Sequence, residues 1–220
     1  MNKHFAIFDM DGTLVDSMIF WQSLGREFLA SRGITNQVDA VLERIVPMTM
    51  RESAALFIQE FGLPGTPESV AAEMNAVMER HYRSDIPLKS AVREYLDMLQ
   101  HAGVKMCVAS ATPVDLINAC LTRLGVAGYF SFLLSCDEVG AGKDRPWVYK
   151  TAALRLGASP GETAVYEDAL YAAKTAKEAG FYTVGVYDNC AAKNWEALKA
   201  LSDEIIQDWS AAPKPLIFIQ

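Results

Sequence analysis

The stretch Phe5-Ala-Ile-Phe-Asp-Met-Asp-Gly-Thr-Leu-Val-Asp-Ser17 decides the fold of this chain. Its first four residues form an apolar run that is too short for an independent helix and suits a strand buried on both faces of a parallel sheet. Asp9 and Asp11 follow where this strand ends, and Gly12 allows the backbone to turn sharply there. Because residues two apart along a strand share a face, both carboxylates should point into one small volume. Met10 should point away and offer only its backbone N–H.

Composition indicates a globular protein. The 220 residues suit one α/β domain, alone or with a modest insertion, and apolar residues make up 51% of the chain. The net charge of −7, without any run of Lys and Arg, argues against a nucleic-acid partner, so an anionic substrate needs help from a local cation. We find neither an export signal nor a membrane-spanning run and expect a cytoplasmic protein, a monomer or weak dimer. The four cysteines are widely spread, which favours buried free thiols over zinc or disulfides.

Two kinds of pattern follow the first strand. Residues 17–87 show helical spacing throughout, with helices expected up to Gly33 and at 37–46, 50–61 and 67–83, so they form a compact helical insertion. From Leu88 strands and helices alternate, which is typical of a parallel sheet with crossover helices. Strands are expected at 104–109, 132–134, 163–166 and 182–187. Helices are expected at 90–102, 114–124, 146–156, 169–179 and 194–201. Residues 205–206 and 216–219 are weaker last elements.

Polar side chains follow four of these strands. Asp9 and Asp11 follow the first, Ser110 the second, Lys143 lies in the loop after the third, and Glu167 with Asp168 end the fourth. Ligands of open parallel sheets bind beyond the carboxyl ends of the strands, so these side chains should meet in one pocket.

Four carboxylates in one pocket repel one another. At about 4 Å and an effective dielectric near 20, each like-charged pair costs on the order of 4 kcal/mol, which Lys143 alone does not offset. A hard divalent cation with oxygen ligands is therefore implied, and Mg²⁺ suits a few carboxylates, waters and a substrate phosphate. Without a cluster of His or Cys, zinc is disfavoured.

These motifs, in this order, resemble those of the haloacid dehalogenase-like hydrolases, specifically the subgroup with a helical cap inserted after the first strand. Asp9-Met-Asp-Gly-Thr-Leu-Val-Asp16 resembles the first and most specific motif, and Ser110, Lys143 and Glu167-Asp168 resemble the others. The resemblance implies a Rossmann-like, doubly wound catalytic core of residues 1–16 and 88–220 and a cap of residues 17–87.

The resemblance also implies roles for these residues. Asp9 is the expected nucleophile, which forms an aspartyl-phosphate, and Asp11 the general acid and base. Mg²⁺ is expected on Asp9, the Asp11 carbonyl and Asp168, with Glu167 in or beside the metal shell. The phosphoryl group is expected to bind to side chains and backbone groups of Met10, Gly12, Thr13, Ser110, Ala111 and Lys143.

Two departures from the family pattern lie near these motifs. Lys143 is followed by Asp144-Arg145-Pro146-Trp147 where many relatives have Pro-x-Pro-Asp, and Ala169 stands where many have a small hydroxyl residue.

The favoured activity is Mg²⁺-dependent hydrolysis of a small phosphate monoester from a phosphorylated metabolite. A sugar phosphomutase like β-phosphoglucomutase is the alternative, because Arg51-Glu52-Ser53 resembles a cap stretch that holds a second phosphate. Those mutases carry a cap histidine where this chain has Trp21, which favours the phosphatase. A non-catalytic binding protein is a third interpretation, against which the intact acidic motifs argue.

Overall fold

The computed structural model describes residues 2–46 and 48–214. The chain divides into two compact units. One, which we call the sheet unit, contains the chain up to Ser17 and from Ile86 onward, and the other, the helical unit, runs from Met18 to Asp85. These junctions lie one and two residues from the predicted ones at 16/17 and 87/88. The roles of catalytic core and cap are taken up below as a proposal.

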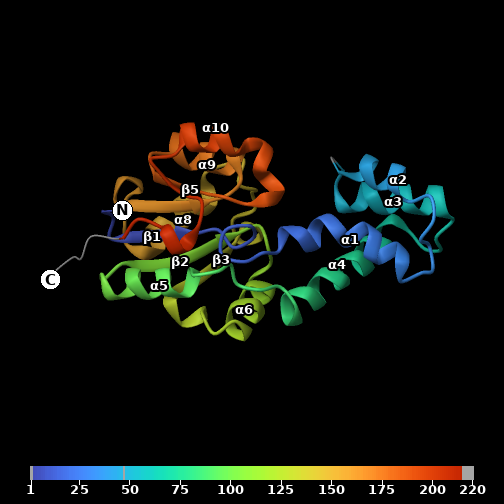
Figure 1. The fold of residues 1–220 in the computed structure, drawn as a ribbon, viewed down its shortest axis with the longest axis horizontal. Coiled ribbons are helices and arrows are strands. Elements are labelled where there is room, and N and C mark those ends of the chain that lie inside the picture. The colour runs from blue at the N-terminus through green and yellow to red at the C-terminus, as the bar shows by residue number, and fades with distance from the viewer. Residues whose placement is uncertain (1, 47, 215–220) are drawn as a thin grey trace. The chain divides into compact units, whose positions relative to one another are not determined.

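The sheet unit contains a six-stranded parallel sheet with the strand order β3-β2-β1-β4-β5-β6. The strands are β1 (Phe5–Phe8), β2 (Lys105–Ser110), β3 (Phe130–Ser135), β4 (Thr163–Glu167), β5 (Tyr182–Val186) and β6 (Glu204–Ile206) (Figure 1). The first strand therefore lies between β2 and β4, so the residues that follow these three strands emerge side by side. The predicted α/β class and doubly wound sheet are confirmed.

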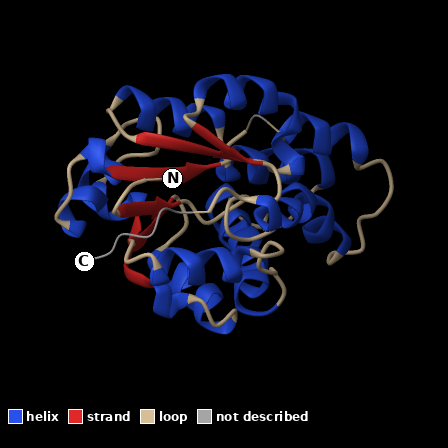
Figure 2. Ribbon diagram, turned by 60° about the vertical axis from the view of Figure 1, so that its left-hand side comes forward, coloured by secondary structure: helices blue, strands red, loops and turns tan. Residues whose placement is uncertain are grey.

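Helices lie on both sides of this sheet (Figure 2). They are α5 (Val92–His101), α6 (Val114–Arg123), α7 (Cys136–Val139), α8 (Trp147–Leu156), α9 (Leu170–Glu178) and α10 (Trp195–Leu201). Within the described residues, short 3₁₀ turns lie at η1 (Ala127–Tyr129), η2 (Pro160–Glu162), η3 (Asn189–Asn194) and η4 (Trp209–Ala211). The four-residue α7 was not predicted, because it is too short to show a helical period.

Alternation along β1 explains how both faces of the sheet are covered. Ile7 packs into a buried cluster with residues of α8 and α9, such as Val148 and Ala176. Phe8 points to the opposite face, where its ring stacks on Tyr166 with centroids 4.2 Å apart. Burial on both faces is why the strand reads as a continuous apolar run.

The helical unit consists of α1 (Met18–Ala30), α2 (Asp39–Ile45), α3 (Met50–Phe61) and α4 (Pro67–Ser84). Capping boxes begin two of these helices, from Thr49 with Glu52 in α3 and from Thr66 with Ser69 in α4. The first helix ends at Ala30, three residues before the predicted end at Gly33, which has a positive φ of 75° in the turn that follows.

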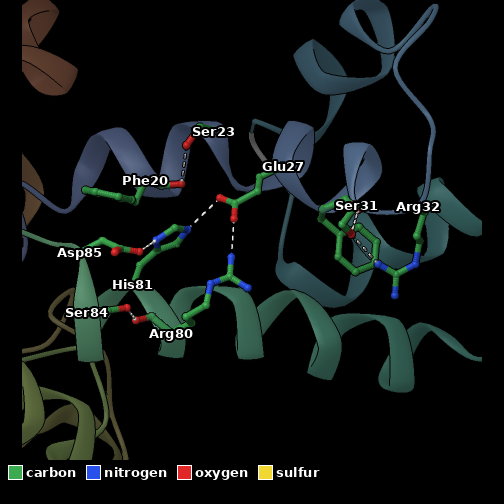
Figure 3. A network of polar contacts seen from close by, with 10 residues as sticks. Phe20, Ser23, Glu27, Ser31, Arg32, Arg80, His81, Ser84 and Asp85 are labelled. Atoms are coloured by element: carbon green, nitrogen blue, oxygen red, sulfur yellow. Dashed lines mark hydrogen bonds and ion pairs between the residues drawn. The ribbon is translucent and has the colours of Figure 1, made fainter.

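A charged network joins α1 to the end of α4 (Figure 3). The buried His81 places Nδ1 2.7 Å from Asp85 Oδ2 and Nε2 2.7 Å from Glu27 Oε2. Arg80 forms an ion pair with the other Glu27 oxygen. Asp85 is the last residue of the helical unit, so this network ties that end of the unit to its first helix.

The two linkers to the helical unit are hydrogen-bonded to each other within the sheet unit. Val15 and Leu88 form an antiparallel bridge. Asp16 N–H donates to the Pro87 carbonyl at 3.0 Å, and Lys89 N–H donates to the Leu14 carbonyl at 2.9 Å. The exit and the return of the chain therefore run as a short two-stranded ribbon.

Two further expectations concern the chain as a whole. Each cysteine is a free thiol, with Cys107, Cys120 and Cys136 buried and Cys190 half-buried. Among the helices within residues 2–46 and 48–214, none has the length and apolar character needed to cross a membrane. The predicted element at 216–219 lies outside the described residues.

Candidate active site

The loop after β1 delivers the first two acids. Asp9 N–H still donates to the Tyr166 carbonyl of β4 at 3.0 Å, and the chain then turns, with Gly12 N–H donating to the Val15 carbonyl at 3.0 Å. Gly12 adopts φ 79°, a left-handed conformation that side chains disfavour. Asp9 is buried, whereas Asp11 is half-buried. The predicted sharp turn after the acids is therefore present.

Lys143 is the cation of this site. It is buried, with its Nζ hydrogen-bonded to Asp9 Oδ1 and, at 2.5 Å, to Glu167 Oε1. Burial alone would lower the pKa of Lys143, but the two carboxylates hold that pKa above its ordinary value. The ammonium therefore stays charged and joins the ends of β1 and β4.

Negative charge remains in excess around Lys143. Burial raises the pKa of Asp9 well above its ordinary value; Lys143 opposes this shift, and the neighbouring carboxylates add to it. Burial and the charge of Glu167 raise the pKa of Asp168 to about 7, again against the effect of Lys143. Both directions indicate a pocket that binds a proton or another cation readily.

Asp11 is held by groups from the end of β2. The Thr112 hydroxyl donates to Asp11 Oδ2 at 2.7 Å, and the Ser110 hydroxyl lies 3.4 Å from the same oxygen. Thr112 N–H in turn donates to Ser110 Oγ at 3.1 Å, so the turn after β2 is itself fixed. The two acids thus have different partners, an ammonium for Asp9 and hydroxyls for Asp11.

The remaining predicted residues of the sheet unit differ in their contacts and burial. The Thr13 hydroxyl donates to Asp168 Oδ1 at 3.3 Å. The Met10 side chain is fully buried. Ala111 is exposed, directly after the buried Ser110. The structure therefore brings together the predicted side chains from the ends of β1, β2 and β4 with Lys143.

Three carboxylates fit a metal site. Asp9, Glu167 and Asp168 each offer one oxygen, and these oxygens lie within 4.8 Å of one another. All three are hard oxygen donors, of the kind that Mg²⁺ takes. The excess negative charge described above gives such a cation a physical reason to bind.

The helical unit contains a pocket of its own, with a volume of about 550 Å³. It is lined by twelve uncharged residues: Trp21, Gln22, Leu24, Gly25, Leu42, Ile45, Val46, Met48, Met50, Ser53, Met74 and Asn75. Gly25 allows close packing in this lining, because a Cβ there would lie 2.8 Å from Leu42 Cδ2 and force that side chain to shift. The pocket suits an uncharged organic group.

Arg51, the predicted second phosphate ligand, belongs to the helical unit but does not line this pocket. Its side chain is 72% exposed and pairs with Glu68 at 2.5 Å. In this structure it therefore forms a surface ion pair.

Two polar residues of the site were not predicted. Thr112 lies in the stretch Ser110-Ala-Thr-Pro113, where its hydroxyl could have been noted as a second polar group after β2. Tyr149, whose hydroxyl donates to Glu167 Oε1 at 2.7 Å, lies on the buried face of α8. An aromatic residue at such a position is ordinarily core, and the sequence carries no signal of its second contact.

Comparison with known proteins gives a consistent result. A family model of haloacid dehalogenase-like hydrolases matches residues 6–186. Validoxylamine A 7'-phosphate phosphatase of Streptomyces hygroscopicus subsp. limoneus is 30% identical over 184 residues, which cover 82% of this chain and 84% of the relative. Fructose-1-phosphate phosphatase of Escherichia coli is 27% identical over 82% of this chain and 94% of the relative. A solved structure, a putative β-phosphoglucomutase from Thermotoga maritima, superposes with a TM-score of 0.80 at 25% identity and covers 96% of each chain.

Proposed function

The chain belongs to the haloacid dehalogenase-like hydrolases, and on that basis we propose that it is a Mg²⁺-dependent phosphatase of a small phosphate monoester. The observation that carries this proposal is the buried Lys143, which contacts Asp9 and Glu167 while Asp11 is held separately by Thr112. Two acids with different partners suit two different tasks on one phosphoryl group.

In the first step, Asp9 attacks phosphorus and forms an aspartyl-phosphate as the bond to the ester oxygen breaks. Asp11, protonated at this stage, gives its proton to the departing alkoxide, so the leaving group departs as an alcohol. The hydroxyls of Thr112 and Ser110 hold the Asp11 carboxyl in one orientation. Lys143, Ser110 and the backbone groups of the turn after Asp9 stabilise the negative charge on the phosphoryl oxygens.

In the second step, Asp11 accepts a proton from water, which attacks the aspartyl-phosphate. Inorganic phosphate leaves and Asp9 returns as a carboxylate, so Asp11 has acted first as an acid and then as a base. Splitting one displacement into two in this way lowers the barrier of each.

Asp9, Asp168 and Glu167, with the Asp11 backbone, are the proposed ligands of Mg²⁺. When bound, this cation would supply positive charge to the phosphoryl oxygens. Its proposed ligands are Glu167 at the end of β4 and residues that directly follow β1 and β4, which pair side by side in the sheet.

Substrate choice is proposed to depend on the helical unit, acting as a cap. The uncharged pocket lined by Trp21 and Met50 suits a neutral leaving group such as a polyol or sugar. The relatives support this class, because both are named as phosphatases and one of them acts on fructose 1-phosphate. We expect the enzyme to meet such a phosphorylated metabolite in the cytoplasm.

A sugar phosphomutase is the second candidate, favoured by the similarity to the putative β-phosphoglucomutase. A mutase must hold two anionic groups, yet none of the described residues that line the cap pocket is charged, and Arg51 pairs with Glu68. The phosphatase is therefore the better supported activity. A binding protein without catalysis is disfavoured by the assembled acids and lysine.

The proposal is tested by assaying the purified protein with p-nitrophenyl phosphate and a panel of sugar and polyol phosphates, with Mg²⁺ and with a chelator. We expect Mg²⁺-dependent phosphate release that Asp9→Asn abolishes. Conversion of hexose 1-phosphate to hexose 6-phosphate without net phosphate release would identify the mutase instead.

A further inference from the structure

Tyr149 is a buried phenol that contacts the acidic site from within the hydrophobic core. Its ring packs in the cluster on one face of the sheet and lies edge-on to Phe181, with centroids 6.2 Å apart. The residue is fully buried, and its hydroxyl donates to Glu167 Oε1 at 2.7 Å. A buried phenol requires an acceptor, and this one takes a carboxylate of the proposed metal site.

Glu167 Oε1 receives two donors, since Lys143 Nζ lies 2.5 Å from the same oxygen. Within the described residues, the structure shows no hydrogen bond to the other oxygen, Oε2. The two oxygens of one carboxylate are therefore in different situations. Oε1 is saturated by a phenol and an ammonium, and Oε2 remains for another ligand.

Lys143 alone does not fix this arrangement. Its ammonium is a compact charge with three rotatable donors, and it follows either carboxylate oxygen. The Tyr149 hydroxyl sits at the end of a rigid ring locked into the core, so it selects which oxygen turns inward. Hydrogen bonds of this kind orient metal ligands in many proteins.

We propose that Tyr149 is a positioning residue that commits Glu167 Oε1 to Lys143 and leaves Oε2 to face the cation. This inference rests on the proposed function, because it assigns a role within the same site. Glu167 thereby accepts from Lys143 with Oε1 and offers Oε2 to the cation. The orientation of Lys143 toward Asp9 then depends indirectly on the Tyr149 hydroxyl.

The phenol is suited to this task over a wide pH range. Burial and the neighbouring charge of Glu167 raise the pKa of Tyr149 well above its ordinary value. The shift favours the protonated phenol, which is the form that donates to Glu167.

Tyr95 provides a matched control. It is also fully buried, and its hydroxyl lies 3.0 Å from the Tyr166 hydroxyl, so it contacts another phenol rather than a carboxylate of the site. Tyr95→Phe and Tyr149→Phe each remove one buried hydroxyl and keep the ring. A purely structural role for Tyr149 predicts that the two variants behave alike.

The test compares both variants with the wild type by circular-dichroism melting, by calorimetric titration of the metal-free protein with Mg²⁺ and Mn²⁺, and by kinetics with p-nitrophenyl phosphate. For Tyr149→Phe we expect a Kd for the cation raised about tenfold, and a lowered kcat at a nearly constant KM. For Tyr95→Phe we expect only a lower melting temperature. Equal cation affinities in the two variants would overturn the proposal.

A double-variant cycle with Glu167→Gln supplies a second, independent check. If Tyr149 acts through Glu167, then Tyr149→Phe should change the Kd for the cation much less in the Glu167→Gln background. Undiminished change in that background would refute the assignment. The titrations also separate this inference from the proposed function: a wild type that binds Mg²⁺ without hydrolysing any phosphate ester contradicts the function alone, and the comparison of Kd values still decides the role of Tyr149.

Discussion

The Thr112 hydroxyl donates to Asp11 Oδ2 at 2.7 Å, which joins the turn after β2 to the acid that follows β1. Both turns leave adjacent strands of the sheet, so the contact depends on the parallel pairing of β1 with β2. The role proposed for Asp11, which gives and then takes a proton in two successive steps, benefits from such a fixed orientation.

Thr112→Val keeps the shape of the side chain and removes this hydrogen bond. Since hydrogen bonds to charged groups contribute about 1.5–3 kcal/mol, we expect kcat to fall roughly 10- to 100-fold. Thr112→Ser should recover most of the activity. Steady-state kinetics of the two variants measures this, and equal losses in both would show that the methyl group matters instead of the hydroxyl.

Asp9→Asn tests the nucleophile. The amide keeps the shape but has no attacking charge, so turnover should fall at least ~10³-fold, which corresponds to about 4 kcal/mol of activation free energy. Asp39→Asn is the matched control, because Asp39 is 79% exposed in the helical unit and pairs only with Arg26 among the described residues. Mass spectrometry of the wild type quenched during turnover should detect the aspartyl-phosphate, and wild-type turnover in Asp9→Asn would disprove a covalent mechanism.

Asp168→Ala tests the metal site. Loss of one charged ligand should raise the Mg²⁺ concentration needed for half-maximal activity about 10- to 100-fold, while saturating Mg²⁺ restores part of kcat. A chelator should abolish wild-type activity, and added Mg²⁺ should restore it. Full activity in excess chelator would contradict the role assigned to this residue.

The pH dependence of stability follows from the same residue. In metal-free protein the pKa of Asp168 is raised to about 7, above the value near 4 of an unfolded chain, so the folded state holds this proton more tightly. The stabilisation is complete below about pH 4 and is lost as the pH rises through about 7. Melting temperatures in chelator should therefore fall between about pH 4 and pH 7, and by less in Asp168→Asn. An equal fall in the two proteins would remove Asp168 as the cause.

Pocket variants in the helical unit test substrate choice. Met50→Ala and Trp21→Ala enlarge the uncharged pocket, so relative kcat/KM values across a panel of phosphate esters should change more than the Mg²⁺ requirement does. Met78→Ala is the control, because Met78 is buried in the same unit but does not line the pocket. Uniform losses in all three variants, with lowered melting temperatures, would assign these side chains to packing alone.

Arg51→Ala addresses the mutase alternative in the same panel. Breaking the exposed pair with Glu68 should cost little stability, about 0–1 kcal/mol. If Arg51 binds substrate, kcat/KM should fall selectively for esters that carry a second anionic group. An unchanged panel would leave Arg51 as a surface residue.

Sequence patterns predicted the strand ends well, for a physical reason. A strand buried on both faces must be apolar along its length, so Asp9 and the Glu167-Asp168 pair mark where burial of apolar residues stops. Strand ends meet at one sheet edge, and the assembly of Asp9, Lys143, Glu167 and Asp168 follows from that topology. The order of these residues along the chain was enough to predict it.

Contacts that depend on side-chain direction were not predictable in the same way. Whether the Thr112 hydroxyl points to Asp11 depends on the conformation of the turn after Ser110. The ring of Tyr149 packs in the core, as expected for an apolar position of α8. Its hydroxyl, at the far end of the side chain, makes the polar contact with Glu167. The short helix α7 was missed for a different reason. Four residues are too few to show a helical period, although the capping box of Ser135 and Glu138 marks in the sequence where the helix begins.

The ribbon formed by Val15 and Leu88 has a consequence for exchange of the helical unit. Val15 and Leu88 pair within the sheet unit at the point where the chain leaves for the helical unit and returns from it. The inserted segment is therefore a loop with adjacent ends, and the entropy cost of closing such a loop depends only weakly on its length. Segments of different size and lining are tolerated at such a splice point without rebuilding the strands on either side. Exchange of this one contiguous segment would therefore alter the substrate choice proposed for the helical unit without altering the residues that follow β1, β2 and β4.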